Sequence, residues 1–333
     1  MRITSETLHK IARDTAQQRS RSDRDLLAIY LQGSLLTSEP LLGGTADIDL
    51  FLVHNEEVEQ QREIVRLTDD VHLDIVHHPR SLYRQARELR LDPWLGYGVY
   101  NCRTLHDPQH FMDFTQASVR GQFYHPNNVL ARANSQAENA RQSWFELANQ
   151  PSQPGSDTLS LYLRAIEYAS NAVALLSGPP LPERRFLLQF QERAQAIQHA
   201  GLYNGLLGLL GAPLTDVKTL TGWLPAWREA FLAIPPEQRP VQLHLCRLSY
   251  YLHAFEAILK SNQPTAVLWP LIKTWQQVTS LLPAGSPARN AWQGAGERLG
   301  VLGEGFTIRI NALDAFLDTL EEILEDWARQ AGL

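Results

Sequence analysis

The sequence predicts an α+β protein, in which an α/β module with a small mixed sheet occupies residues 1–112 and an all-α helical bundle occupies residues 113–333. Short runs of β-branched and aromatic residues, bounded by Gly, Thr, Asn or Asp, are typical of strands, and they lie in the first part only. From about Phe111 onward these signals vanish, and helical patterns recur between breaks that contain Pro or Gly. A chain of 333 residues also exceeds one ordinary domain, which favours two.

The elements of the first part follow from local pattern. Residues 3–19 have helical spacing with Leu8 and Ile11 on an apolar side that can pack on a sheet. Strands are predicted at residues 28–32, 47–53, 71–76 and 99–105. Short helices are predicted at residues 35–39 and 81–91.

The second part is predicted to be helical throughout. Helices are expected at residues 114–148, 158–176, 183–199, 224–233, 241–259, 265–282 and 310–331. Breaks at residues 150–156 and 178–180 separate the first three of them.

Three carboxylates on the predicted strands form a candidate metal site. Successive side chains of a strand point to opposite faces, so Asp47 and Asp49 share one face, with Ile48 on the buried one. Asp74 joins them if its strand lies beside theirs. Two anions ~4 Å apart repel by about 4 kcal/mol at an effective dielectric near 20, so a cation is expected among them. Hard oxygen ligands suit Mg²⁺ or Mn²⁺.

A Gly-Ser turn precedes the carboxylates. The strand ending at Gln32 runs into Gly33-Ser34 and then into the predicted short helix, whose unpaired N–H groups favour phosphate. Gly33 lets the backbone approach an anion closely, and Ser34 offers a hydroxyl as a helix cap or as a donor to phosphate. The order is therefore strand, phosphate turn, short helix, carboxylate strand.

This arrangement resembles the polymerase-β-like nucleotidyltransferase superfamily, whose pattern is Gly-Ser, then D-x-D on a strand, then a third Asp on a later strand. The match covers roughly residues 26–76. The resemblance implies that Asp47 and Asp49 bind two metal ions with the NTP triphosphate and that Asp74 binds the metal nearer the acceptor hydroxyl. It also implies that Gly33 and Ser34 hold the β- and γ-phosphates.

The helical part is similar in kind to that of antibiotic nucleotidyltransferases such as kanamycin nucleotidyltransferase. There the helical part can supply a general base, and Glu167 is the candidate to take the proton of the acceptor hydroxyl. Arg184 and Arg185 are candidates to bind phosphate of the nucleotide. An exposed helix Glu and a solvated first helical turn remain the alternatives for these three residues.

The expected activity is metal-dependent transfer of NMP, with ATP as the expected donor, to a hydroxyl acceptor with release of pyrophosphate. The expected acceptor is a small molecule such as an aminoglycoside-like antibiotic. Two alternatives stay open: modification of a protein or RNA partner, in a regulatory or toxin-antitoxin pair, and a catalytically inactive NTP-binding module.

Charge and hydropathy indicate which partners and which location to expect. The net charge of -6 disfavours a general nucleic-acid-binding surface, which needs clustered Lys and Arg. Residues 1–16 are charged and amphipathic, and no apolar run reaches the length of a membrane span, so a cytoplasmic protein without membrane contact is expected.

Histidines near the third carboxylate allow one further interpretation. Because His72, His77 and His78 surround Asp74 and His54 ends the preceding strand, a His/Asp transition-metal hydrolase is an alternative. Adjacent residues of a strand point in opposite directions, however, which favours a simple strand end.

Overall fold

The computed structural model describes residues 3–149 and 156–333, so the break predicted at residues 150–156 lies, except for its last residue, outside them. The chain forms two compact units. Met1–Asn128 and Pro240–Ala254 make up the first, and Val129–Arg239 and Phe255–Leu333 make up the second. The domain division predicted after residue 112 stays a prediction. The compact units themselves place residues 113–128 and 240–254 with the sheet.

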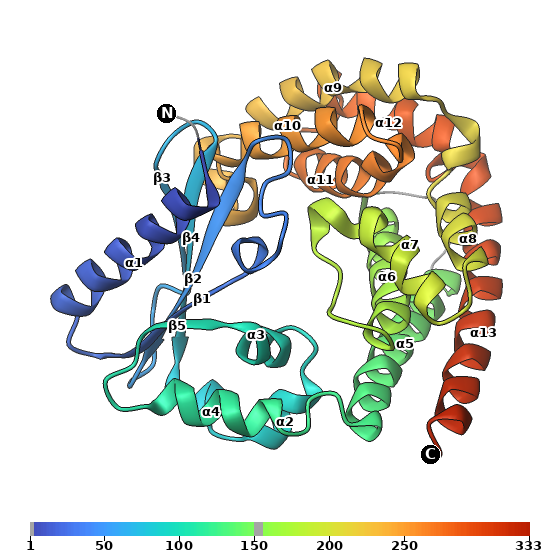
Figure 1. Cartoon of the computed structure of the whole chain (residues 1–333). Helices are drawn as coiled ribbons and strands as arrows, with labels where there is room; N and C mark the ends of the chain where they lie inside the picture. The colour runs from blue at the N-terminus through green and yellow to red at the C-terminus, as the bar shows by residue number, and fades with distance from the viewer. Residues whose placement is uncertain (1–2, 150–155) are drawn as a thin grey trace. The chain divides into compact units, whose positions relative to one another are not determined.

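A five-stranded sheet forms the centre of the first unit, with the strand order β3-β4-β2-β1-β5 (Figure 1). Its strands are β1 (Leu26–Gln32), β2 (Ala46–His54), β3 (Arg62–Arg66), β4 (Val71–Pro79) and β5 (Arg103–His106). β2 and β4 are parallel, whereas the other neighbouring pairs are antiparallel. The predicted α+β class with a small mixed sheet is therefore confirmed. β3 escaped prediction because only Ile64 and Val65 separate its charged residues.

One face of the sheet packs on helix α1 (Ser5–Ser22), close to the helix predicted at residues 3–19. The side chain of Thr4 accepts a hydrogen bond from the N–H of Thr7 and so caps the first turn. Leu8 and Ala12 of the helix belong to the same buried cluster as Ile48 of β2. Burial of this apolar side stabilises the helix and fixes which face of β2 is turned inward.

The other face is covered by three helices, α2 (Ala86–Leu91), α3 (Leu95–Asn101) and α4 (Phe111–Arg120). Met112 and Val119 of α4 are buried in one cluster with Tyr30 of β1. β1 is thus buried on both faces, which explains its nearly continuous apolar sequence.

Three local predictions in this part are wrong. The strand predicted at residues 99–105 begins only with β5, because the carboxylate of Asp92 accepts the N–H groups of Trp94 and Leu95, both at 2.8 Å, just before α3. The helix predicted at residues 81–91 is a 3-10 turn (Arg80–Tyr83) followed by α2. The helix predicted at residues 35–39 is a 3-10 turn of three residues (Ser34–Leu36), since a residue before Pro avoids helical conformation.

The second unit consists of helices, as predicted. The helices after α4 are α5 (Pro126–Ala148), α6 (Ser156–Leu175), α7 (Phe186–Ala196), α8 (Gly201–Leu209), α9 (Val217–Leu232), α10 (Arg247–Leu259), α11 (Leu268–Ser280), α12 (Pro287–Leu299) and α13 (Phe306–Gln330). Of these, α10 lies in the first unit up to Ala254. The single helix predicted at residues 114–148 is in fact α4 and α5, because Pro126 starts a new helix. α8 and α12 were not predicted.

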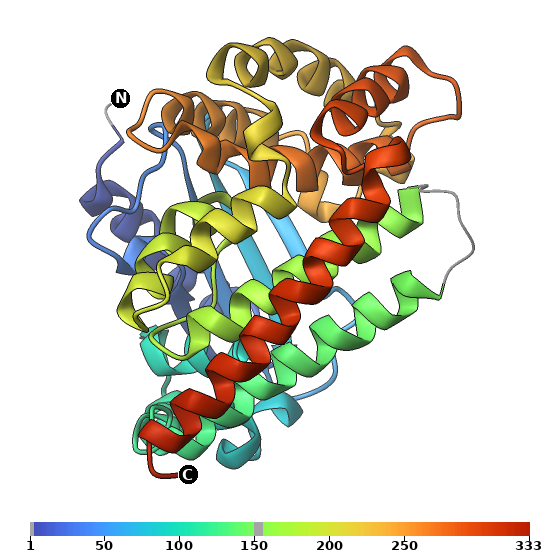
Figure 2. The same cartoon turned by 90° about the vertical axis from the view of Figure 1, so that its right-hand side faces the viewer.

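A cluster of ion pairs joins the long helices α5 and α13, which run side by side in the second unit (Figure 2). Arg141 of α5 donates to Asp314, Asp318 and Glu321 of α13 at 2.6 to 2.8 Å. No helix in the described ranges combines the length and apolarity that crossing a membrane requires.

Candidate active site

Three carboxylates meet on one face of the sheet in the first unit. The parallel register of β2 and β4 places Asp49 directly opposite Asp74, and Asp47 lies two residues before Asp49 on the same face. Each of the three offers an oxygen within 4.8 Å of the others. Asp47 and Asp74 are buried, and Asp49 is partly exposed. The acidic cluster expected from the alternation of β2 therefore exists.

Asp74 is held by two arginines. Arg62 of β3 donates from Nε to Oδ1 at 2.7 Å and from Nη2 to Oδ2 at 2.6 Å, in a bidentate pair. Because Ile64 lies opposite Asp74 in the antiparallel register, Arg62 two residues away shares that face. Nη2 of Arg247 also donates to Oδ2. Asp74 is only 1% exposed, so these charged partners offset the cost of burying its charge.

Helix α10 brings a third donor residue, Tyr250, to the carboxylates. The hydroxyl of Tyr250 donates to Oδ2 of Asp47 at 2.6 Å, and the guanidinium of Arg247 lies 5.7 Å from the centre of the Tyr250 ring. The loop before β2 approaches the same helix closely, since a Cβ on Gly43 would lie 2.1 Å from the carbonyl oxygen of His253. This close approach requires glycine and ties α10 to the carboxylate strand.

The Gly-Ser turn lies against the second carboxylate of the D-x-D pair. Gly33 has φ of +82°, and a Cβ there would lie 1.9 Å from Oδ2 of Asp49. Glycine is therefore required for both conformation and space. Oγ of Ser34 is buried and has no hydrogen-bond partner among the described residues. The short 3-10 turn supplies no helix N-terminus, so any phosphate contact falls to the Ser34 hydroxyl and the backbone of the turn.

Burial and the crowding of negative charge raise the pKa of Asp49 well above its ordinary value. Burial is the largest cause, followed by the charges of Asp47 and Asp74, whereas the charges of Arg247 and Arg62 act in the opposite direction. A divalent cation beside Asp49 would relieve this repulsion. Within residues 3–149 and 156–333, no donor makes a hydrogen bond to the Asp49 carboxylate.

The donor set fits Mg²⁺ or Mn²⁺ at Asp47 and Asp49. All the ligand atoms on offer are carboxylate oxygens, which these hard cations prefer. Asp49 has no hydrogen-bond donor to displace, and the buried Ser34 hydroxyl beside the turn is available to an anion. Asp74 fits less well, because guanidinium groups already occupy both of its oxygens.

The other predicted residues lie in the second unit, and their roles stay predictions. Glu167 of α6 accepts from Nζ of Lys273 at 2.5 Å, and the same Nζ lies 3.8 Å from Glu183. Arg184 and Arg185 follow Glu183 in a 3-10 turn (Glu183–Arg185), where Arg184 is buried. Lys273 thus links Glu167 to the turn that carries both arginines.

Arg62, Arg247 and Tyr250 were missed by sequence reasoning. Arg62 sits in the strand with the weakest signal, although its alternation with Ile64 could have shown that both share a face. Arg247 and Tyr250 follow the carboxylates by about 170 to 200 residues, and nothing local marks them.

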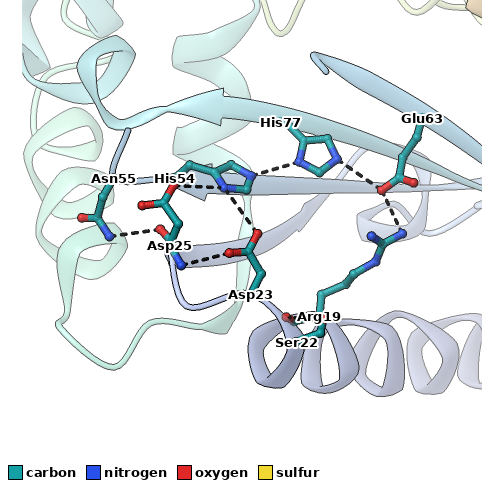
Figure 3. A network of polar contacts seen from close by, with 8 residues as sticks. All are labelled: Arg19, Ser22, Asp23, Asp25, His54, Asn55, Glu63 and His77. Atoms are coloured by element: carbon teal, nitrogen blue, oxygen red, sulfur yellow. Dashed lines mark hydrogen bonds and ion pairs between the residues drawn. The ribbon is translucent and has the colours of Figure 1, made fainter. Parts of the chain in front are cut away.

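The histidines do not form a metal site. In the part of the chain that the structure describes, the three carboxylates are the only group arranged to hold an ion. His54 and His77 instead share a hydrogen bond of 2.9 Å between Nε2 and Nδ1, and Nε2 of His77 faces Glu63 at 3.2 Å (Figure 3). Nδ1 of His54 faces Asp25 at 3.5 Å. The two histidines thus belong to a network of polar contacts near the C-terminal ends of β2 and β4.

Comparison with protein-family models gave no match, and comparison with curated proteins gave none either. Among solved structures, the chain is similar to a nucleotidyltransferase-like protein from Exiguobacterium sibiricum. The alignment covers 75% of this chain and 78% of that one, with a TM-score of 0.36 and 11% identity. Likeness at this level carries no functional argument, so function rests on the side chains described above.

Proposed function

We propose that the protein is a metal-dependent nucleotidyltransferase. The observation that supports this most directly is the meeting of Asp47, Asp49 and Asp74 beside the Gly33-Ser34 turn, in which Gly33 touches Asp49. An acidic cluster next to a glycine-containing backbone turn could hold a divalent cation and neighbouring phosphate groups.

In the proposed reaction an acceptor hydroxyl oxygen forms a bond to the α-phosphorus of an NTP, and the bond from that phosphorus to the bridging oxygen breaks. Pyrophosphate leaves, and the proton of the hydroxyl goes to a base. Asp47 and Asp49 would hold Mg²⁺ or Mn²⁺, and the bound ion would neutralise charge at the phosphates. Gly33 and Ser34 bind the β- and γ-phosphates in this proposal.

Tyr250 and Arg62 act by positioning in this centre. The Tyr250 hydroxyl fixes the orientation of Asp47, and the bidentate Arg62 pair fixes that of Asp74. Glu167 is retained as the candidate base, with Arg184 and Arg185 as candidate phosphate ligands. The proposed donor is ATP, and the proposed acceptor is a small hydroxylated molecule such as an aminoglycoside-like antibiotic.

Labelled transfer tests the proposal. The protein is incubated with α-labelled NTPs, Mg²⁺ and a panel of small hydroxyl acceptors, and we expect labelled acceptor and pyrophosphate. Asp47→Ala and Asp49→Ala should each abolish transfer while the circular dichroism spectrum is kept. Asp69→Ala, which removes an exposed carboxylate from the loop between β3 and β4, is the matched control and should leave transfer unchanged.

The outcomes separate the candidate functions. Transfer to the protein itself or to an added partner would replace the small-molecule acceptor by a macromolecular one. Binding of NTP without any turnover would indicate an NTP-binding module. Substantial transfer by Asp49→Ala would contradict the metal assignment.

A further inference from the structure

We propose that this centre holds one divalent cation, at Asp47 and Asp49, and that Arg62 and Arg247 take the place of a second cation at Asp74. The inference rests on the proposed function and specifies its metal requirement. It also departs from the two-metal arrangement that the resemblance to the polymerase-β-like nucleotidyltransferases implies.

The first argument is the occupancy of the Asp74 carboxylate. Two oxygens offer about four lone-pair positions. Arg62 fills one on each oxygen, at 2.7 and 2.6 Å, and Arg247 fills the second on Oδ2. A metal ion at Asp74 would therefore displace a charge-assisted hydrogen bond or take the single remaining position.

The second argument is that Arg247 cannot easily leave. Its side chain is 8% exposed, and its buried Nε has no hydrogen-bond partner in the described parts of the chain. Asp74 is the carboxylate with which it forms an ion pair. Removing that partner would leave a buried, unpaired guanidinium, which is strongly unfavourable.

The third argument is charge balance. Two fixed guanidinium groups beside three carboxylates leave one net negative charge before any ion or nucleotide binds. One divalent cation changes this net charge from negative to positive. A second would lie next to two positive side chains at short range, where repulsion is strong.

The remaining carboxylates suffice for one ion. Mg²⁺ is commonly bound by one or two protein carboxylates, with water and substrate phosphate completing its shell. Asp47 and Asp49 are such a pair, and Asp49 is the carboxylate that lacks a hydrogen-bond donor among the described residues. Arg62 and Arg247 thus act through Asp74 as positioning residues that supply fixed positive charge.

Counting bound Mn²⁺ tests this proposal without measuring activity. Equilibrium dialysis is run with Mn²⁺ alone and with Mn²⁺ plus α,β-methylene ATP on both sides of the membrane. We expect one excess Mn²⁺ per chain in both conditions, and none for Asp49→Asn. Two ions per wild-type chain with the analogue would overturn the one-cation centre and leave the proposed function standing. No excess ion in either condition would overturn both.

Variants of the arginines test their role. The double variant Arg62→Met/Arg247→Met frees Asp74, and its count should rise from one ion to two. Arg66→Met, which alters an exposed arginine of the same strand as Arg62, should stay at one. A count that stays at one in a folded double variant would overturn the role given to the guanidinium groups. If the double variant does not fold, Arg62→Met, whose parent side chain is 34% exposed, serves instead. It frees Oδ1 of Asp74, so a count of two is expected, and a count of one would overturn the role given to Arg62.

Discussion

Gly33 and Asp49 are in such close contact that a single methyl group on Gly33 would overlap Oδ2 of the aspartate, at 1.9 Å. The turn and the carboxylate strand are therefore parts of one surface in the first unit. Because Gly33 also has a left-handed φ of +82°, two independent constraints act on this residue. They can be separated by experiment.

Gly33→Ala should lower the free energy of unfolding by about 2 to 5 kcal/mol, because alanine is strained at this φ and its Cβ overlaps Asp49. It should also abolish Mn²⁺ binding, because the overlap displaces the Asp49 carboxylate. Gly44→Ala is the matched control. Gly44 has φ of +77°, but a Cβ there would meet nothing within 4 Å. Gly44→Ala should lower the free energy of unfolding by only about 1 kcal/mol and leave Mn²⁺ binding intact. Denaturation measures the first quantity and equilibrium dialysis the second. Equal effects of the two changes would show that overlap with Asp49 has no role.

Tyr250→Phe removes the hydroxyl that orients Asp47 and should weaken Mn²⁺ binding about tenfold, as expected for a residue that orients a metal ligand. Tyr162→Phe removes a buried hydroxyl in the second unit, where it donates to the carbonyl oxygen of Leu209 at 2.9 Å. That control should lose about 1 kcal/mol of stability without any change in Mn²⁺ affinity. An unaltered Mn²⁺ affinity in Tyr250→Phe would exclude the positioning role.

The stability of the protein should fall below neutral pH, and His78 is one cause. Burial, and then the charge of His77, lower the pKa of His78 to about 4, and its Nδ1 shares a hydrogen bond of 2.7 Å with the Tyr83 hydroxyl. As the pH falls, the His78 side chain is protonated near pH 6.5 in the unfolded chain and only near pH 4 in the folded chain. Stability is therefore fully present above pH 6.5 and declines as the pH falls between these values.

Urea denaturation at pH 7 and pH 5 measures this effect. Wild type should lose about 1 to 2 kcal/mol through His78 on going to pH 5, and His78→Phe should lose that much less. His54, whose pKa is also lowered, mainly by burial and by the charge of His77, contributes in the same direction in both proteins. An identical pH dependence of the two proteins would contradict the prediction.

Glu167→Gln should reduce turnover by a factor of about 10² to 10⁴ with little change in NTP affinity, since a general base acts on the acceptor proton and not on nucleotide binding. Glu183→Gln is the control, because Glu183 is the other carboxylate near Nζ of Lys273, at 3.8 Å. Single-turnover kinetics and nucleotide titration measure the two quantities. If the rate of Glu167→Gln is unchanged, Glu167 has no part in the proton transfer.

Local pattern was sufficient for the parts of the site that lie within one element. The alternation of β2 places Asp47 and Asp49 on one face and Ile48 on the other, and the structure agrees. The last strand, β5, ends at His106, so the loss of strand signals from about Phe111 onward agrees with the structure. The exact ends of elements were predicted less accurately, as at residues 99–105, where helix α3 extends to Asn101 and the strand begins at Arg103.

The sequence by itself determined the fold class, the D-x-D pair and the Gly-Ser turn, because these depend on interactions between residues close together in the chain. The tertiary structure decided which groups surround Asp74. Contacts between distant segments place Asp74 beside Asp49 in parallel register, and they bring Arg62 of β3 and Arg247 of α10 to its carboxylate. The alternation of a strand shows which face of the sheet a side chain occupies, but not which strand lies beside it. The positive charges that balance Asp74 could therefore be identified only from the folded chain.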